Sequence, residues 1–88
     1  MIVSGRIVKG RKTLFSRRAE DGRGGGAGFR DKLESCLLRL CGDADISVPV
    51  WLSKNTAELA RFGKTSFFAE QFVERVEFDR FEIRIDEP

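Results

Sequence analysis

The pattern of hydrophobic and polar residues at the start of the chain predicts a β-hairpin. Two stretches, residues 2–8 and 13–15, are rich in β-prone apolar residues, and the polar tetrapeptide 9–12 separates them. Gly10 lies where a tight turn favours glycine, whereas Gly5 is expected to weaken the first strand. We therefore expect two antiparallel strands that meet at a turn around Gly10.

The clearest periodicity lies in residues 29–41, where six apolar side chains share one face of a predicted helix. They recur at intervals of three and four residues: Phe29, Leu33, Cys36, Leu37, Leu40 and Cys41. Gly42 predicts the end of this helix. Leu38 lies on the opposite face, so we expect it to contact a neighbouring element or a partner subunit.

Residues 19–28 predict a flexible loop, because they contain five glycines and almost no apolar surface. Residues 22–27 satisfy the G-x-G-x-x-A fingerprint of dinucleotide-binding sites, but the segment before them is charged and does not predict a buried strand. Residues 63–66 resemble the end of a P-loop, but Glu58 occupies the position of its first glycine. Neither motif therefore predicts a nucleotide site.

The second half of the chain predicts an extended segment followed by a short helix. Residues 46–52 alternate, but Pro49 lacks the N–H donor of a central strand, so this segment is an edge strand or an extended stretch. Asn55, with Glu58 three residues later, has the pattern of a capping box. We therefore expect Asn55 to cap a short helix over residues 56–62.

The remaining residues predict helical turns and then a strand. One or two turns are expected over residues 66–73, with Phe68 and Phe72 stacked one turn apart. In residues 76–85 the apolar positions change from even to odd numbers, so a strand there needs a β-bulge or a bend at residues 79–80.

These elements together predict one small α+β domain over residues 1–88. It would contain an N-terminal hairpin, one main helix, short helices and a C-terminal strand that pairs with the hairpin. With 41% hydrophobic residues, including eight Phe, the chain can form a small core.

Charge is divided unequally along the chain. Residues 1–40 contain ten Lys/Arg and four Asp/Glu, whereas residues 41–88 contain six and ten. Such a division either attracts a polyanion to one end or pairs the two halves with each other. In the second case, Arg6, Lys9 and their neighbours would face the carboxylates of the C-terminal strand, namely Glu77, Glu82 and Asp86.

In the first case, cations around the glycine-rich loop and the start of the main helix would hold phosphate groups. Guanidinium groups and free backbone amides suit that chemistry, and the candidates are Arg11, Lys12, Arg17, Arg18, Arg23 and Arg30. Nucleic-acid binding is therefore the alternative function.

The chain has few residues suited to catalysis or metal binding. It contains no His and no Tyr, so the commonest general acid–base residue is missing, and we expect neither an enzyme nor a cofactor nor a metal site. Cys36 and Cys41 lie about 140° apart on a helix and cannot bridge each other, so we expect both to be core residues. Without a secretion signal or an apolar run of about 20 residues, we expect a cytoplasmic protein with no membrane contact.

Several segments of the second half resemble a group of short uncharacterised bacterial proteins. The matching segments are Val48-Pro49-Val50-Trp51-Leu52, Lys54-Asn55-Thr56, Lys64-Thr65 and Phe78-Asp79-Arg80-Phe81-Glu82-Ile83. The resemblance implies a small bacterial cytoplasmic protein and no known activity, and it does not include the glycine-rich stretch.

The leading functional prediction is a non-enzymatic protein-interaction module that self-associates or binds a protein partner. It depends on Leu38, on the edge at Pro49 and on the many Phe residues for so short a chain, because exposed apolar surface usually marks a contact site.

Overall fold

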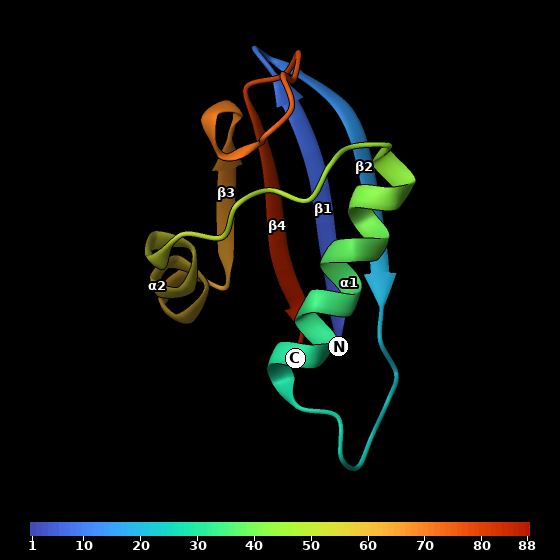
Figure 1. Ribbon diagram of the computed structural model, residues 1–88. Coiled ribbons are helices and arrows are strands. Elements are labelled where there is room, and N and C mark those ends of the chain that lie inside the picture. Colours follow the sequence, from blue (N-terminus) through green and yellow to red (C-terminus); the bar gives the residue numbers. More distant parts are fainter.

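The computed structural model describes all 88 residues and consists of a four-stranded antiparallel sheet with two helices (Figure 1). Along the chain the elements are β1 (Ile2–Lys9), β2 (Lys12–Glu20), α1 (Phe29–Ala44), α2 (Ser53–Phe62), β3 (Lys64–Phe68), the 3₁₀ turn η1 (Ala69–Gln71) and β4 (Arg80–Glu87). The strand order in the sheet is β2-β1-β4-β3. The predicted α+β fold is confirmed.

The hairpin and its pairing with the C-terminal strand are confirmed, although Gly5 has a different role from the one expected. Gly10 has a φ of 58° in the turn, and β4 runs antiparallel to β1. A Cβ atom on Gly5 would lie 3.0 Å from Leu40 Cδ1 and 3.1 Å from Phe81 Cε1. The glycine therefore lets α1 approach the sheet closely, which compensates for its low strand propensity.

The glycine-rich loop begins later than predicted, because β2 extends to Glu20. Ala19 lies opposite Val3 in the sheet and is only 3% exposed. The Asp21 N–H, directly after the strand, donates to the Met1 carbonyl at 2.9 Å. In the sequence, Ala19 is a single small apolar residue between Arg18 and Glu20, so this segment shows no alternation of apolar and polar residues that would predict a strand. The prediction of a loop over residues 19–28 was therefore wrong at its first residues.

The main helix also extends beyond its predicted end. Gly42 lies inside α1, and the helix ends at Ala44, with Asp45 as its C-cap at a left-handed φ of 57°. The Asp45 N–H donates to the Gly42 carbonyl, and the Ile46 N–H donates to the Cys41 carbonyl at 3.0 Å. Ile46 packs against the core, so its burial favours the additional turn over a stop at the glycine.

Asn55 is not the N-cap residue of the second helix. The helix α2 begins at Ser53 with Leu52 as its N-cap, and Asn55 lies at the third helical position, where its Oδ1 accepts the Leu52 N–H at 2.9 Å. Glu58 accepts a hydrogen bond from Thr65 instead of completing a capping box. The predicted end of this helix at Phe62 is confirmed.

The predicted helical turns over residues 66–73 are wrong in their first half. Thr65 and Phe67 face the core while their neighbours do not, and β3 pairs with β4, so this segment is a strand. Phe72 packs edge-on against Phe78 at 5.3 Å between ring centroids, in place of the predicted stacking on Phe68.

Of the two alternatives predicted at residues 79–80, the β-bulge is absent, whereas the chain bends at residues 77–79, immediately before β4. β4 begins only at Arg80, so the even-numbered apolar residues Val76 and Phe78 lie in the preceding loop and no change of face is needed within the strand. The register shift between β1 and β4 lies at the other end, next to Ile2 and Val3. Residues 46–52 form no strand and are an extended segment, one of the two predicted alternatives.

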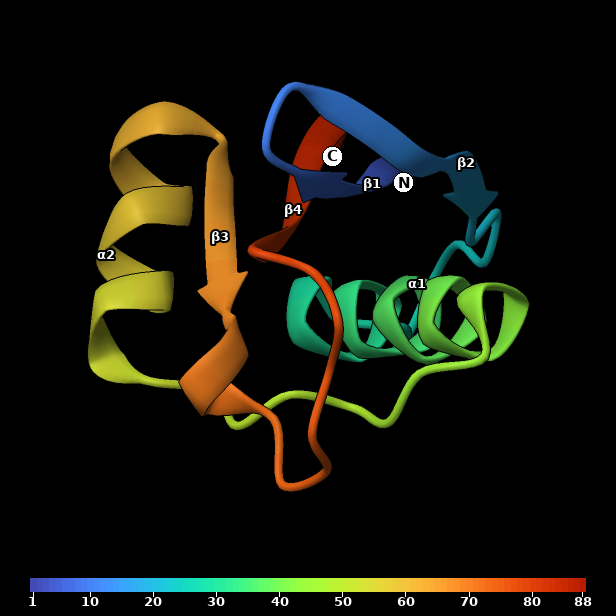
Figure 2. The same ribbon diagram turned by 90° about the horizontal axis from the view of Figure 1, so that it is seen from above.

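The core lies between the sheet and α1. Phe67, Phe81, Ile83, Val3 and Leu40 are its largest fully buried apolar side chains. Cys36 and Cys41 are buried in it as free thiols, as predicted. Figure 2 shows α1 against one face of β1 and β2, α2 alongside β3, and no element over the other face of the central strands.

The opposite charges of the two halves meet across the sheet, as one of the two interpretations predicted. Arg6 Nε lies 3.1 Å from Glu82 Oε1, and Arg18 Nε lies 3.6 Å from Asp86 Oδ2. Glu77, however, pairs with Arg75 and not with the hairpin. The predicted pairing is therefore confirmed for Glu82 and Asp86, but not for Glu77, and Lys9 takes no part in it.

Candidate functional site

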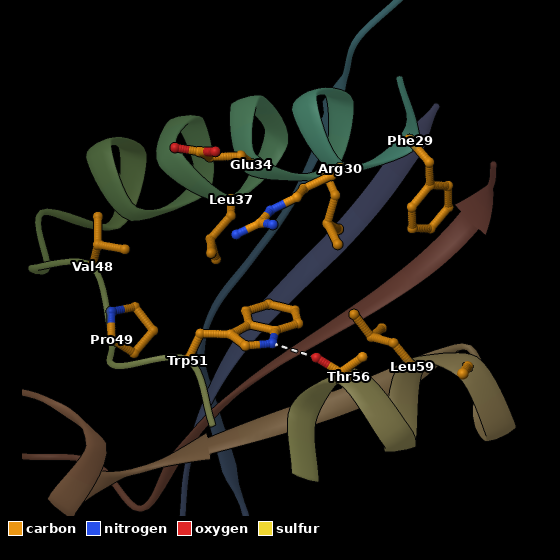
Figure 3. A pocket seen from close by; sticks show the side chains of 11 residues that line it. Phe29, Arg30, Glu34, Leu37, Val48, Pro49, Trp51, Thr56 and Leu59 are labelled. Carbon is orange, nitrogen blue, oxygen red and sulfur yellow. Dashed lines mark hydrogen bonds between the residues drawn. The ribbon is translucent and has the colours of Figure 1, made fainter. Parts of the chain in front are cut away.

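A groove of about 650 Å³ lies between α1 and α2, on the face of the sheet that carries the core (Figure 3). Three segments form its walls: α1, the extended segment before α2, and α2 itself. Seven of its eleven lining residues are hydrophobic. The eleven are Phe29, Arg30, Leu33, Glu34, Leu37, Val48, Pro49, Trp51, Thr56, Leu59 and Ala60. Its volume is within the usual range for ligand sites, about 300–1,000 Å³.

Trp51 forms one wall of the groove and is held by contacts on several sides. Its Nε1–H donates to Thr56 Oγ1 at 2.8 Å, and its ring centroid lies 5.6 Å from that of Phe67. The preceding residue is fixed by Gln71, because the Val50 N–H donates to the Gln71 carbonyl and Gln71 Nε2 donates to the Val50 carbonyl at 3.1 Å. Trp51 therefore remains 37% exposed in a preorganised position, which lowers the entropy cost of binding.

A buried amide behind this wall joins the extended segment to the sheet. Asn55 is fully buried, and its Nδ2 donates to Thr65 Oγ1 at 2.7 Å and to the Ser66 carbonyl at 3.1 Å. Its Oδ1 accepts the Leu52 N–H at 2.9 Å and Gln71 Nε2 at 3.1 Å. Both donors and both acceptor positions of the amide are thus used, so the position of the Trp51 wall is specified by β3 and η1 together.

Arg30 supplies the positive charge of the groove. In Figure 3 its guanidinium extends from α1 into the groove in the direction of Trp51, whereas the Glu34 carboxylate points away from the groove. No hydrogen bond or ion pair within the chain engages Arg30. At the start of α1, Gly28 is the N-cap and makes no side-chain hydrogen bond, so the first N–H groups of the helix are available. An anionic group bound in the groove would be favoured by the Arg30 guanidinium.

The two residues predicted to contact a partner occupy different surroundings. Pro49 is buried and lines the groove, next to exposed Val48 and Val50. Leu38 is 49% exposed on α1 and does not line the groove. The structure therefore does not bring Leu38 and Pro49 together at the groove.

The six predicted phosphate-binding cations are likewise not brought together. Arg30 lines the groove, whereas Arg11 and Lys12 lie at and just after the hairpin turn, without ion pairs. Arg17 lies over the Phe15 ring at 5.9 Å. Arg18 approaches Asp86, as described above.

Arg23 is engaged by the loop that carries it. Its Nη2 lies 2.6 Å from Asp21 Oδ2, its Nε contacts both oxygens of the same carboxylate, and its backbone N–H also donates to Asp21. These bonds hold the pKa of the Asp21 carboxyl well below its usual range. Arg23 therefore anchors the end of β2 to the loop instead of presenting a vacant guanidinium.

The groove was not predicted from the sequence. Phe29, Leu37 and Leu59 belong to predicted helices, and Trp51 to the predicted extended segment, but their convergence depends on packing between distant segments. The sequence feature that could have indicated the groove was the apolar run at residues 48–52, which contains Pro49. This run is too short to span a membrane, and its apolar side chains are too exposed for those of a buried strand.

The groove is lined mainly by apolar side chains and contains few polar groups. Its only charged residues are Arg30 and Glu34, and its only hydroxyl, Thr56 Oγ1, accepts from Trp51. No group of three Cys, Asp or Glu residues lies close enough to hold a metal ion. Burial raises the pKa of the Cys41 thiol to about 11, which keeps it protonated at neutral pH.

Comparison with known proteins adds no family to this description. None of the helices is long and apolar enough to cross a membrane. No protein-family model, no curated protein and no solved structure matches the chain.

Proposed function

We propose that this protein is a small non-enzymatic protein-interaction module, and that the groove between α1 and α2 binds an apolar peptide segment of a partner protein that also carries a carboxylate. The observation that carries the proposal is the preorganised, partly exposed Trp51 wall facing an unpaired guanidinium, Arg30. Apolar surface exposed in a concave site usually marks a contact surface.

The choice of a peptide with an acidic group follows from charge complementarity. Apolar side chains of the peptide would contact Leu37, Leu59 and Trp51, and a carboxylate would pair with Arg30. A second copy of the chain is the other occupant to consider, since self-association is expected from the exposed apolar residues. The experiment below distinguishes the two.

Trp51 is the only tryptophan, so its emission reports directly on the groove. The probe is a 12-residue synthetic peptide without aromatic residues, with leucines three and four positions apart and two aspartates. We expect a change in Trp51 emission with a Kd of about 10–100 µM, or about −7 to −5.5 kcal/mol. A control peptide with lysines in place of the aspartates should bind at least about fivefold more weakly, and Arg30→Gln should remove that preference.

Two alanines on α2 provide a matched pair of variants. Ala60 lines the groove and Ala57 does not, although both are exposed on the same helix. Ala60→Arg should weaken binding of the acidic peptide by about tenfold or more, whereas Ala57→Arg should change it less than about twofold. Equal affinity of both variants, or no emission change with either peptide, would contradict the proposal.

Light scattering tests the second copy as occupant. A peptide partner predicts that the protein is a monomer under the conditions of the titration. A dimer that Ala60→Arg dissociates and Ala57→Arg does not would show that the groove binds another copy of this chain instead.

A further inference from the structure

The face of the sheet opposite the helices carries a second surface with different chemistry. Register places two rows of directly opposed residues across all four strands, and both rows point away from the core: Lys64–Arg84–Ser4–Arg18 and Ser66–Glu82–Arg6–Ser16. We call these eight residues the open face. A depression of about 490 Å³ lies on it, and exposed Phe62 lines the depression beside Lys64.

The open face is cationic, and its charges are placed unfavourably for the sheet alone. Four cations lie in the two rows, against the carboxylates of Glu82 and the adjacent Asp86. Lys64 lies directly opposite Arg84, and like charges in that position destabilise a strand pair. An anionic ligand would remove this repulsion.

The ion pairs on this face leave the outer edge of each guanidinium available. Arg6 contacts Glu82 at 3.1 Å, Arg84 contacts Asp86 at 2.9 Å, and in both cases the nitrogen is Nε. Arg18 also approaches Asp86 through Nε, at 3.6 Å. The carboxylates thus orient the three arginines, and their terminal Nη groups have no partner within the chain. Paired Nη donors suit the oxygens of a phosphate group.

Asp86 itself is firmly held as an anion. Ser4 Oγ donates to its carboxylate, Arg84 Nε donates to the other oxygen, and these bonds lower the pKa of Asp86. The carboxylate therefore remains charged at neutral pH and keeps the arginines in their rows.

Phe62 adds the feature that distinguishes nucleic acid from other polyanions. It is 63% exposed at the end of α2, at the margin of the depression. Aromatic side chains beside a cationic groove stack on the bases of single-stranded nucleic acid without regard to sequence. We propose that the open face binds single-stranded nucleic acid, with the phosphates on Arg6, Arg84 and Lys64 and a base on Phe62. This site lies on the opposite side of the sheet from the groove.

The site differs from the one predicted along the glycine-rich loop. Of the six cations predicted from the sequence, only Arg18 belongs to the open face. Lys12, at the start of β2, is an exposed lysine outside the two rows and therefore supplies a matched control for Lys64.

The test is fluorescence anisotropy with a 5′-labelled 12-nucleotide oligo-dT at 20 and 150 mM KCl, on the full chain. Three phosphate contacts predict that the logarithm of the binding constant falls with the logarithm of the KCl concentration with a slope of about −2, since each contact contributes about 0.7. Lys64→Ala should weaken binding at 20 mM about tenfold and reduce the slope by about 0.7. Lys12→Ala, which removes the same charge, should change the affinity less than about twofold.

Phe62→Leu tests the aromatic contribution, because it keeps an apolar side chain and removes the ring. It should weaken binding about fivefold to tenfold and leave the salt slope unchanged. Circular dichroism of each variant checks that the fold is retained.

Three results would overturn the proposal. The first is the absence of binding at 20 mM KCl. The second is an equal loss of affinity in Lys12→Ala and Lys64→Ala. The third is an unchanged affinity in Phe62→Leu together with full competition by inorganic polyphosphate or poly-glutamate. The last result would assign the face to polyanions in general.

Discussion

Asn55→Ala tests whether the buried amide holds the Trp51 wall in place. The variant removes four hydrogen bonds, two to Thr65 and Ser66 and two from Leu52 and Gln71. Each is worth about 1 kcal/mol net, and more where the remaining partner stays buried and unpaired. Water can reach the Leu52 N–H, which belongs to an exposed residue, whereas Thr65 and Gln71 are buried. We therefore expect the free energy of unfolding to fall by about 3–4 kcal/mol.

This loss is large for a chain of this length. At about 0.05–0.15 kcal/mol per residue, the whole domain is stabilised by about 4–13 kcal/mol. Urea unfolding followed by Trp51 emission and by far-UV circular dichroism measures the difference, and coincident transitions justify a two-state treatment. The control Thr56→Ala removes only the hydrogen bond to Trp51 Nε1 and should cost about 0.5–1 kcal/mol. If Asn55→Ala lowered the free energy of unfolding no more than Thr56→Ala, the buried amide would not hold the Trp51 wall in the way that we infer.

Three further predictions concern the core and the loop. Gly5→Ala should lower Tm by about 5 °C in a thermal melt, because the added methyl group meets two fully buried side chains at about 3 Å and overpacking outweighs the gain in strand propensity. Cys36 and Cys41 should react with a thiol reagent only after unfolding in guanidinium, since burial raises the pKa of both thiols, and rapid reaction of the folded protein would contradict this. The lowered pKa of Asp21 contributes stability that is present above its unfolded value, about 3.9, and is lost as the pH falls through the folded value. Urea midpoints at pH 7 and pH 3 should therefore differ less in Arg23→Gln than in the natural sequence, and an equal difference would contradict the assignment.

Local patterns in the sequence were sufficient for the hairpin and for α1. Gly10 and the stripe from Phe29 to Cys41 express the geometry of a turn and of a helix within one segment, so neither requires knowledge of distant contacts. The same holds for the end of α2 at Phe62, where Gly63 adopts a left-handed φ of 72°.

Patterns that depend on distant partners were interpreted wrongly. The alternation of Thr65 and Phe67 is short, and it becomes a strand only because β4 pairs with it and the two residues enter the core. Asn55 has the residue type of an N-cap, but its side chain is used by Thr65 and Gln71, which lie ten and sixteen residues away. In each case a long-range contact outweighed the local preference.

The candidate surfaces were only partly predictable for the same reason. Arg30 was predicted to bind an anion, but together with the arginines around the glycine-rich loop, whereas the structure places it in the groove with Trp51. The cross-strand pairing of Arg6 with Glu82 was predicted from charge, since charge is a property of each half of the chain. The row that joins Lys64 to Arg84 needs the register of β3 on β4, which no local pattern contains.

Side chains of β4 point alternately to the two faces of the sheet, and each face carries one of the two proposed surfaces. Phe81 and Ile83 point into the core below the groove, and Glu82 and Arg84 point to the open face, because successive residues of a strand face opposite sides. A substitution at Arg84 therefore changes the open face without entering the core, and Ala60 on α2 does not line the depression of that face. Lys64→Ala should leave the peptide titration of Trp51 unchanged, and Ala60→Arg should leave the oligonucleotide affinity unchanged. If either variant impaired both activities, the two faces would be coupled, and the assignment of separate sites would have to be abandoned.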